Sequence, residues 1–576
     1  MAKSTLQVMD LTSLRAVLGD LRTQIIPSRF EKAQQPNQHS LQLGFRTLTG
    51  MIWLELSWQA DAARLVRIPP PCREGSGSTL AQQVQHGLRQ LALVQLEQRD
   101  FERVVLFHFA PRPGETSVRT LVLELMGRHS NVLLLDEQQR ITAIARQVRQ
   151  HQSRVRPLSS GDPYIPPPSL QNLPPSLEEP FDQWQRRLTL VPLGLGQALR
   201  DTYQGISPSL TRQLINIPST DEGTPALSAS TPIAEISQKQ WLLLHARWTR
   251  WLNKLSCGDF NLHLDEAGGY RVWNEPPDSA SESASESESL SLRLGLYYRN
   301  HLNQRKLLRE SLELQQLLEQ SRQREQAQRL EQVERLNATA GADDLQHQAD
   351  AILCQAAPER ESIERAQKLY QRARRLRRSI PSIEERLDHH DQRLALIDGS
   401  ENFLTDLMQA DWDDSDDRIR QLRELRVELE DLLTPRRRRR RSGPPQGQPQ
   451  PLELLTQDGL LIQIGRNHRQ NEWISLRQAR AGDLWFHAQE CPGSHVVLKA
   501  SAAAASEQDL QLAADLAAWF SRAKGNRLVP VVMTGVEHLQ RIPGTAPGTV
   551  RHRQAELVWA EPDRACRNLE ARNPLA

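Results

Sequence analysis

Hydrophobic positions alternate with polar ones, or form short unbroken runs, over most of residues 1–168. That pattern is typical of β-strands, and two longer stretches of helical periodicity interrupt it at 11–21 and 79–95. The strands that we predict here are 29–34, 40–46, 51–57, 103–109, 120–125 and 131–136. We therefore expect a mixed α/β domain, which ends at a Pro- and Ser-rich tract.

The apolar pattern changes to a helical period after this tract. Residues 180–269 predict a helical domain with a tight turn at 205–208 between two helices, and residues 290–433 predict a long arm of two helices. Pro381 is expected to kink or split the second arm helix. A 3/4 repeat in that helix predicts a coiled coil with the first. Its apolar positions are Ala366, Leu369, Ala373, Leu376, Ile380, Ile383, Leu387 and Leu394.

Composition separates the arm from the last region. Residues 434–451 contain an arginine run followed by Ser, Gly, Pro and Gln, which is typical of a linker. Residues 452–576 predict a compact α+β domain; its elements are strands at 460–464, 472–476 and 528–533, a strand pair within 483–499, and a helix at 507–524. The chain is thus predicted to be an α+β multidomain protein. It would comprise a mixed α/β N-terminal domain, a helical hairpin domain, a long antiparallel coiled-coil arm and a C-terminal α+β domain.

Charge is informative through its distribution, because 72 Lys and Arg nearly balance 70 Asp and Glu. The arginine run at 436–441 is a concentrated cation. Side chains such as Arg436, Arg438 and Arg440 could neutralise RNA phosphates and strengthen binding at low salt. A solvated linker explains such a run equally well, so both interpretations stay open.

Cysteine usage and hydropathy indicate a reducing, aqueous compartment. The five cysteines are scattered and odd in number, which argues against a disulfide framework or a zinc ribbon. No apolar run approaches the ~20 residues that span a bilayer. The sequence Met1-Ala-Lys-Ser lacks the pattern of an export signal. We expect a cytoplasmic location without membrane contact.

Residues 483–499 are the densest candidate for recognition chemistry. They read Asp-Leu-Trp-Phe-His-Ala-Gln-Glu-Cys-Pro-Gly-Ser-His-Val-Val-Leu-Lys, two short apolar runs around a Pro-Gly turn. With a period of two, the even-numbered residues 484–488 and 496–498 share one face. The other face would gather Trp485, His487, His495 and Lys499 into a flat surface of rings and positive charge. Rings stack on bases and cations meet phosphates, so this surface suits nucleotides.

Other chemistries fit the same stretch less well. The rings could instead fill a core, Phe486 above all. A zinc site from His487, Cys491 and His495 would need a helix, which the Pro-Gly turn breaks. Ser494 and His495 are neighbours on a strand and point to opposite faces, which disfavours a nucleophile with its base.

A second dense stretch, residues 124–136, reads Glu-Leu-Met-Gly-Arg-His-Ser-Asn-Val-Leu-Leu-Leu-Asp. Gly127 permits a tight turn between two strands, where Arg128, His129 and Asn131 would project hydrogen-bond donors. No Walker loop, dinucleotide fingerprint, zinc box or nucleophile elbow occurs in the sequence. We therefore expect a binding protein rather than an enzyme, with no cofactor and no metal.

These two stretches resemble the two signatures of the NFACT family, the amino-terminal one at 124–136 and the carboxy-terminal RNA-binding one at 483–499. The segment 203–208 is similar to the family's helix-hairpin-helix, and the two long helices to its coiled-coil arm. Short elements at 163–168 and 544–548 fit as well. The resemblance follows the family's order over nearly the whole chain. It implies an NFACT-N-like domain at 1–168 and an NFACT-R-like RNA-binding domain at 452–576.

Members of this family act in ribosome quality control. The resemblance implies that the chain binds a large (50S) ribosomal subunit blocked by peptidyl-tRNA, contacts rRNA and recruits charged tRNA, which is alanyl-tRNA in the bacterial members called RqcH. The stalled chain would gain an untemplated carboxy-terminal tail that marks it for proteolysis. Peptide-bond formation would stay with the ribosome, and the factor would supply positioning. A small RNA-binding protein, RqcP, is the partner expected in bacteria.

The resemblance also implies which residues act. Glu102 and Arg103 align with an Asp-Arg pair that the family uses to handle tRNA, so the carboxylate here is one methylene longer. Contacts with tRNA are expected from this pair and from Arg128, His129 and Asn131. The arm tip near residues 354–358 is shorter than in other members. Contacts with RNA are expected from Asp483, Trp485, His487, Ser494, His495, Lys499, Arg436, Arg438 and Arg440.

Two other classes of function compete with this one. Some relatives are described as fibronectin-binding surface proteins, but an adhesin is expected to carry an export signal or a wall anchor. A nucleic-acid-processing enzyme is the other class, because the family's first domain resembles formamidopyrimidine-DNA glycosylases. Those enzymes use an N-terminal proline amine, whereas this sequence starts Met1-Ala2-Lys3. We do not expect base excision.

Overall fold

A computed structural model provides the structure. It describes residues 6–71, 78–151, 153, 155–168, 171–216, 227–265, 268–273, 289–354, 359–410, 412, 414–433, 448–543 and 545–570. The arginine run at 436–441 and the arm tip at 355–358 therefore lie outside the described residues. The chain forms two compact units, Met1–His301 and Leu302–Ala576.

The first unit is built on a nine-stranded antiparallel sheet with the order β4-β3-β2-β1-β5-β6-β7-β8-β9. Its strands are β1 (Ser28–Asn37), β2 (Ser40–Thr47), β3 (Gly50–Ser57), β4 (Arg64–Ile68), β5 (Ala92–Gln98), β6 (Val104–Ala110), β7 (Arg119–Glu124), β8 (Asn131–Leu135) and β9 (Ile141–Ile144). The helices α1 (Leu11–Ile25) and α2 (Thr79–Gly87) share one core with it. The sheet confirms the predicted strands and adds β4, β5 and β9.

The predicted helix at 79–95 is too long. Helix α2 ends at Gly87, and the chain reverses at Gln90, whose φ of 66° is left-handed and cannot continue a right-handed helix. From Ala92 the chain runs as strand β5, in which Leu93 and Leu96 are buried in the sheet core. The short helix and the strand together carry the apolar residues that the pattern assigns to one helix.

The predicted helical domain follows, with the bounds α3 (Phe181–Thr189), α4 (Leu195–Thr202), α5 (Pro208–Ile215) and α6 (Gln238–Cys257). Its core combines leucines and isoleucines with tryptophans and one tyrosine, among them Trp184, Trp248 and Tyr203. The Nε1 of Trp251 donates a 3.0 Å hydrogen bond to Thr12 Oγ1 and so fixes α6 against α1. A short η2 (Ile233–Glu235) and the strand pair β10 (His263–Leu264) and β11 (Tyr270–Arg271) complete this region.

The turn between α4 and α5 confirms the predicted helical hairpin and is a packing turn. Gly205 has φ of 76°, and an added Cβ would lie 2.7 Å from Leu11 Cδ2 and 3.2 Å from Phe101. Ser207 caps α5 and also donates a 2.7 Å hydrogen bond to Asp10 Oδ2. Because a carboxylate of the chain itself occupies this helix start, the turn is poorly suited to a phosphate.

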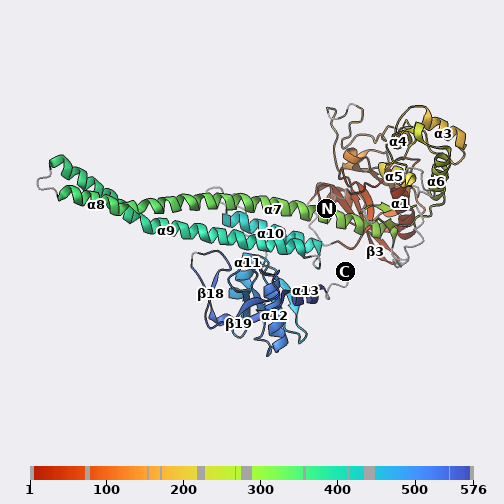
Figure 1. The fold of residues 1–576 in the computed structure, drawn as a ribbon. Coiled ribbons are helices and arrows are strands. Elements are labelled where there is room, and N and C mark those ends of the chain that lie inside the picture. The colour runs from red at the N-terminus through yellow and green to blue at the C-terminus, as the bar shows by residue number, and fades with distance from the viewer. Residues whose placement is uncertain are drawn as a thin grey trace. The chain divides into compact units, whose positions relative to one another are not determined.

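The arm consists of α7 (Leu290–Thr339), α8 (Gly341–Leu353), α9 (Arg360–Gln409) and α10 (Ser415–Leu433), of which the part from Leu302 onward belongs to the second unit (Figure 1). Ion pairs at 2.5 Å join Arg322 to Asp398 and Arg329 to Asp391. From the first ion pair to the second, the residue number rises on α7 by as much as it falls on α9, which confirms that the two helices of the arm are antiparallel. Pro381 lies inside α9 and does not split it.

The C-terminal domain has a six-stranded antiparallel sheet with the order β12-β13-β15-β14-β16-β19. Helices α12 (Glu507–Trp519) and α13 (Pro562–Glu570) share a core with one of its faces. A separate strand pair, β17 (Leu539–Arg541) and β18 (Val550–His552), precedes β19. The sheet strands are β12 (Leu452–Leu455), β13 (Leu461–Ile464), β14 (Leu484–Ala488), β15 (Val496–Leu498), β16 (Val529–Gly535) and β19 (Glu556–Ala560).

The strand predicted at 472–476 is wrong, because this stretch is helical. Asn467 accepts a hydrogen bond from Gln470 N and so starts α11 (His468–Glu472), which continues into a π-helical turn, η4 (Trp473–Arg477). None of the described helices combines the length and the apolar character that crossing a bilayer requires.

Candidate nucleic-acid interfaces

The first candidate interface lies at one end of the nine-stranded sheet. Strand β7 ends at Glu124, a 3-10 turn covers Gly127–His129, and β8 begins opposite Glu124 at Asn131. Leu125 N donates a 2.9 Å hydrogen bond to the carbonyl of Arg103, just before β6 starts. The two sequence features assigned to tRNA, Glu102-Arg103 and the 127–131 turn, are therefore neighbours in the fold.

The cations of this interface differ in exposure. Arg128 and His129 are exposed at the turn, and Arg128 Nε donates a 3.0 Å hydrogen bond to His129 Nε2. Arg103 is half-buried and makes a long 3.4 Å hydrogen bond to the carbonyl of Met9. Burial lowers the pKa of Arg103, while the nearby Asp10 and Glu102 carboxylates raise it. A guanidinium stays charged under such conditions, so Arg103 keeps donor capacity for an added anion.

Asn131 does not project from the turn, so that part of the prediction is wrong. Its side chain is buried, and Nδ2 donates a 2.8 Å hydrogen bond to the carbonyl of Arg146. Its Oδ1 accepts hydrogen bonds of 3.0 Å from Val132 N and from Arg146 N. All of these partners are backbone groups, which shows that Asn131 fixes the path of the chain after β9.

An ion pair that the sequence did not reveal holds this end of the sheet. The carboxylate of Glu124 is fully buried and accepts two hydrogen bonds from Arg156, at 2.9 and 2.5 Å. Tyr164 donates a third, at 3.0 Å, to the same carboxylate. Bidentate pairing of this kind satisfies a buried charge. The Pro-Tyr element that the family resemblance includes thus serves to close the first domain over Glu124.

The second candidate interface is the strand pair β14–β15, which confirms the predicted two faces. Leu484, Trp485 and Phe486 pair with Leu498, Val497 and Val496, respectively. Phe486, Ala488, Val496 and Leu498 are buried in the core that includes α12 and α13. Trp485 and Val497 belong to a separate cluster on the opposite, outer face.

The outer face is covered around Trp485, which contradicts the predicted exposed platform. Trp485 is only 3% exposed, and Ile474 of η4 and Leu539 of β17 pack against it. Its ring stacks on His487, with centroids 5.6 Å apart, and meets His495 edge-on at 5.1 Å. The sequence pattern predicts a strand where η4 lies, so it does not reveal that this segment covers the face.

Two further signature residues are also internal, whereas His487 is half-buried. His495 and Ser494 are buried; Ser475 Oγ lies 2.8 Å from His495 Nδ1, and His495 N donates a 3.0 Å hydrogen bond to Asn471 Oδ1. Burial lowers the pKa of His487 to about 4 and that of His495 well below its usual value. Both rings are therefore neutral at pH 7.

Asp483 and Lys499 form an ion pair at the end of the hairpin. The two charged groups lie 3.2 Å apart, and Asp483 Oδ1 also accepts a 2.5 Å hydrogen bond from Ser501 Oγ. Burial of Asp483 opposes its ionisation, but the hydrogen bonds from Ser501, Arg480 N and Lys499 keep its pKa below the usual value. Lys499 is half-buried, so this pair braces the hairpin more than it faces a ligand.

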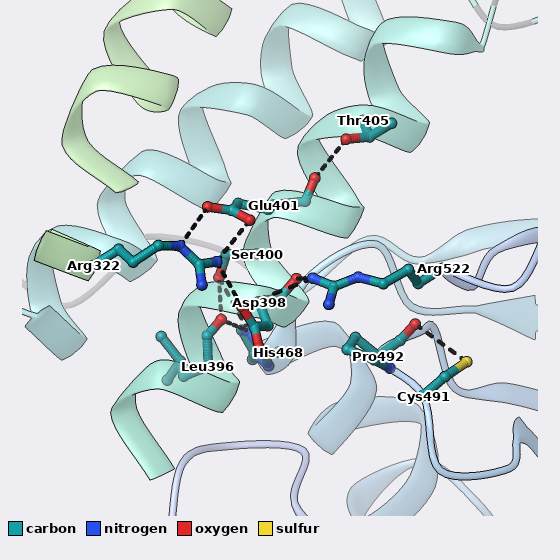
Figure 2. Close-up of polar contacts among 10 residues, drawn as sticks. All are labelled: Arg322, Leu396, Asp398, Ser400, Glu401, Thr405, His468, Cys491, Pro492 and Arg522. Atoms are coloured by element: carbon teal, nitrogen blue, oxygen red, sulfur yellow. Dashed lines mark hydrogen bonds and ion pairs between the residues drawn. The ribbon is translucent and has the colours of Figure 1, made fainter. Parts of the chain in front are cut away.

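The C-terminal domain is tied to the base of the arm by polar contacts (Figure 2). His468 Nε2 lies 3.1 Å from Ser400 Oγ and 3.2 Å from the carbonyl of Leu396, both on α9. Arg522 donates a 3.2 Å hydrogen bond to the carbonyl of Asp398. Burial lowers the pKa of His468 to about 4, so this contact is made by a neutral ring. Within the described residues, no group of three or more His, Cys, Asp and Glu is placed to share a metal ion.

Comparison with known proteins identifies both parts of the chain. Residues 10–357 match the model of the NFACT N-terminal and middle domains, and residues 452–553 match that of the NFACT protein RNA binding domain. The Rqc2 homologue RqcH of Bacillus subtilis is 25% identical over 94% of this chain and 96% of its own length. RqcH of Streptococcus pneumoniae is 24% identical over 96% and 97%.

A solved structure of the C-terminal part of the fibronectin/fibrinogen-binding protein of Streptococcus suis is also similar, at 23% identity with a TM-score of 0.37. The match covers 44% of this chain and 95% of the chain in the Streptococcus suis structure. The match to the N-terminal and middle domains alone extends over more than half of the 576 residues. This chain belongs to the NFACT family.

Proposed function

We propose that this chain is a ribosome quality control factor. It binds large (50S) ribosomal subunits that carry a stalled peptidyl-tRNA. It recruits charged tRNA, chiefly alanyl-tRNA, for untemplated extension of the nascent chain. The observation that carries this proposal is that RqcH relatives align with nearly the whole chain, from the N-terminal domain through the arm to the RNA-binding domain. A role in ribosome quality control rests on the same similarity.

The chain contributes binding and positioning in this proposal, and no covalent chemistry. Exposed Arg128 and His129, with Arg103 beside them, form a surface where tRNA phosphates gain charge-assisted hydrogen bonds. Aligning an aminoacyl-tRNA with a stalled peptidyl-tRNA accelerates their reaction by proximity alone. The ribosome performs the peptide transfer, and RqcP is the proposed small partner on the subunit.

The first experiment is sedimentation of tagged protein from cells through a sucrose gradient. Recovery with free large subunits supports the proposal, whereas recovery only at the cell surface would contradict it and favour a fibronectin-binding role. The gradient should be run at two salt concentrations, because contacts with RNA phosphates weaken as salt rises.

The second experiment separates tRNA handling from subunit binding. Arg103→Ala should abolish tRNA co-purification and leave subunit binding intact, because Arg103 belongs to the first unit and the RNA-binding domain to the second. Arg103→Lys keeps the charge but loses the fork of donors, and should recover tRNA in part. Glu102→Asp restores the family's usual pair and should keep full recovery. Unchanged tRNA in Arg103→Ala would refute this role.

A further inference from the structure

The outer face of the C-terminal sheet is covered only in part. Strand β19 is an edge strand, and two of its large side chains are exposed, Leu557 at 58% and Trp559 at 62%. Leu557 pairs with Val532, which belongs to the same outer cluster as Trp485. Val558, the residue between them, packs into the core on the other face. Leu557 and Trp559 therefore continue the outer face beyond its cover.

An exposed tryptophan on an edge strand needs an explanation. Trp559 pairs with Pro530 of β16, and its own carbonyl accepts a 2.9 Å hydrogen bond from Gln511 Nε2. The backbone is thus held while the indole stays open to solvent. Edge strands in soluble proteins usually avoid large apolar side chains, which invite association. This ring is placed where a partner can reach it, in contrast to the buried Trp485.

Positive charge borders this open face. Arg551 and Arg553, on and after β18, are exposed and form no ion pair with any other described residue. Thr534 Oγ1 donates a 3.0 Å hydrogen bond to the carbonyl of Arg553, which places that backbone beside β16, close to the start of β19. Thr534 lies four residues along β16 from Pro530, the partner of Trp559, which is about 13 Å at ~3.3 Å per residue. Exposed arginines and an open ring thus lie within reach of one extended ligand.

Fewer acidic than basic side chains lie near this face, and arginines pair with some of the acidic ones. Glu472 lies 3.5 Å from Arg541 and 3.8 Å from Arg477, and so offsets some of the charge of those two arginines. Glu556 is exposed at the start of β19, and Glu561 follows its end beside Arg564. The arginines at 551 and 553 keep their charge available for phosphates.

We propose that Trp559 on β19 is a base-stacking site for single-stranded RNA, with Arg551 and Arg553 holding the neighbouring phosphates. This proposal rests on the proposed function, which requires an RNA partner. It assigns base stacking to an exposed ring on an edge strand, in place of the buried Trp485 of the signature. The matched RNA-binding region ends at residue 553, so Trp559 extends that surface. A π-face accepts any base, and cations that track the backbone add affinity without sequence preference.

RNA explains the composition of this face better than a protein partner. A protein partner would meet a small apolar patch of Leu557, Trp559 and Pro530 through shape alone, and would gain little from two arginines at its border. A polyanion with aromatic bases uses both parts at once. A second copy of this chain would bring the same arginines to the interface and repel them.

The test measures binding of a short labelled oligoadenylate to the full-length protein as salt is varied. Trp559→Leu keeps an apolar side chain and should weaken binding about 5-fold to 100-fold without changing the salt dependence, because stacking is removed while the arginines still bind phosphates. Trp559→Phe keeps a ring and should bind nearly as wild type. The double variant Arg551→Gln/Arg553→Gln should lower the slope of log K against log salt by about 0.7 for each phosphate that is no longer neutralised.

Several results would overturn this assignment. Wild-type affinity of Trp559→Leu would remove the ring from RNA binding, and a dimer that only the Leu variant loses would assign the ring to a second copy. Equal circular-dichroism melting of the variants and wild type is expected, because the side chain is exposed. If the wild-type protein binds large subunits but not the oligoadenylate, this inference fails and the proposed function stands. If it binds neither, the proposed function fails as well.

Discussion

The two signature stretches of this chain differ in what they leave open to a ligand. The amino-terminal one ends in a turn, where Arg128 and His129 are exposed although Glu124 and Asn131 are buried. The carboxy-terminal one lies within a sheet that is covered on both faces near Trp485. A residue pattern that identifies a family can therefore consist largely of side chains that build the fold.

The physical reason is the position of each stretch. A turn at the end of a sheet has neighbours on one side only, so its charged tips remain in water. A strand in the middle of a six-stranded sheet has neighbours on four sides once helices pack on one face and a second layer on the other. Polar groups there must find partners inside the protein, as His495 does with Ser475 and Asn471.

The largest predicted effect, a loss of stability that distinguishes a buried structural side chain from an exposed one, is at the Glu124 ion pair. Arg156→Ala leaves a fully buried carboxylate without its bidentate partner and should lower the free energy of unfolding of the first domain by about 3–5 kcal/mol. Arg128→Ala is the matched control on the same end of the sheet and should change it by less than about 0.5 kcal/mol. Denaturant unfolding of both variants measures this difference, and equal stabilities would contradict it.

Acid should destabilise the second interface and leave the first largely unaffected. The pKa of His487, lowered to about 4, lies below its usual value near 6.5, so the unfolded chain takes up a proton in this window and the folded chain does not. The stability present above pH 6.5 is lost as the pH falls toward 4, by up to about 1.4 kcal/mol per pH unit for each such histidine. His495 adds to the same loss.

Hydrogen exchange of β14 and β15, corrected for the intrinsic effect of pH, measures this loss. Protection in the C-terminal sheet should fall between pH 7 and pH 5, and protection in β7 and β8 should change less. Protection in β14 and β15 that does not depend on pH would mean that these rings are accessible and titrate freely, as an open platform requires.

An opposite pH effect is predicted at the arm base. Glu428 is fully buried like Glu124, but its carboxylate accepts a 2.9 Å hydrogen bond from Arg469 N and has no bidentate arginine among the described residues. Burial raises its pKa to about 8, so the folded protein holds a proton there at pH 7 while the unfolded chain does not. Stability at this site is greatest below pH 4.5 and is lost as the pH rises through about 8.

Glu428→Gln removes the titrating group and keeps an acceptor for Arg469 N. The variant should be more stable than wild type at pH 8 and should differ little from it near pH 5. This difference in stability should grow by at most about 1.4 kcal/mol for each pH unit over which wild type loses stability. Urea unfolding of the second unit at both pH values measures this. A constant difference between the two proteins at all pH values would show that Glu428 does not titrate in this range.

Sequence pattern predicts most of the fold because its elements are locally encoded. The alternation at 484–488 indicates the correct faces of β14, and the repeat through Ala366, Ala373 and Ile383 indicates the buried seam of α9. The errors arise where a non-local partner or a cap decides. The helix predicted at 79–95 is cut by a left-handed Gln90, and 472–476 is helical after the Asn467 cap.

Side-chain roles at the candidate sites are harder to predict than the strands. Burial of Trp485 depends on η4 and β17, which come from outside the signature, and the Arg156 partner of Glu124 lies 32 residues away in the chain. Neither the covering of Trp485 nor the partner of Glu124 can be predicted from the residues next to them in the sequence. The tRNA and RNA roles of Glu102, Arg103, Arg128, His129, Asp483, His487 and Lys499 stay predictions, and Arg436, Arg438 and Arg440 lie outside the described residues.

The most direct test of the proposed role is mass spectrometry of stalled nascent chains. A reporter whose message lacks a stop codon is expressed in cells with the wild-type gene, without it, and with Arg103→Ala. We predict an untemplated alanine-containing carboxy-terminal tail with the wild-type gene, and none without the gene or with the variant. Identical reporter termini in all three strains would contradict the assignment of this chain to ribosome quality control by tailing.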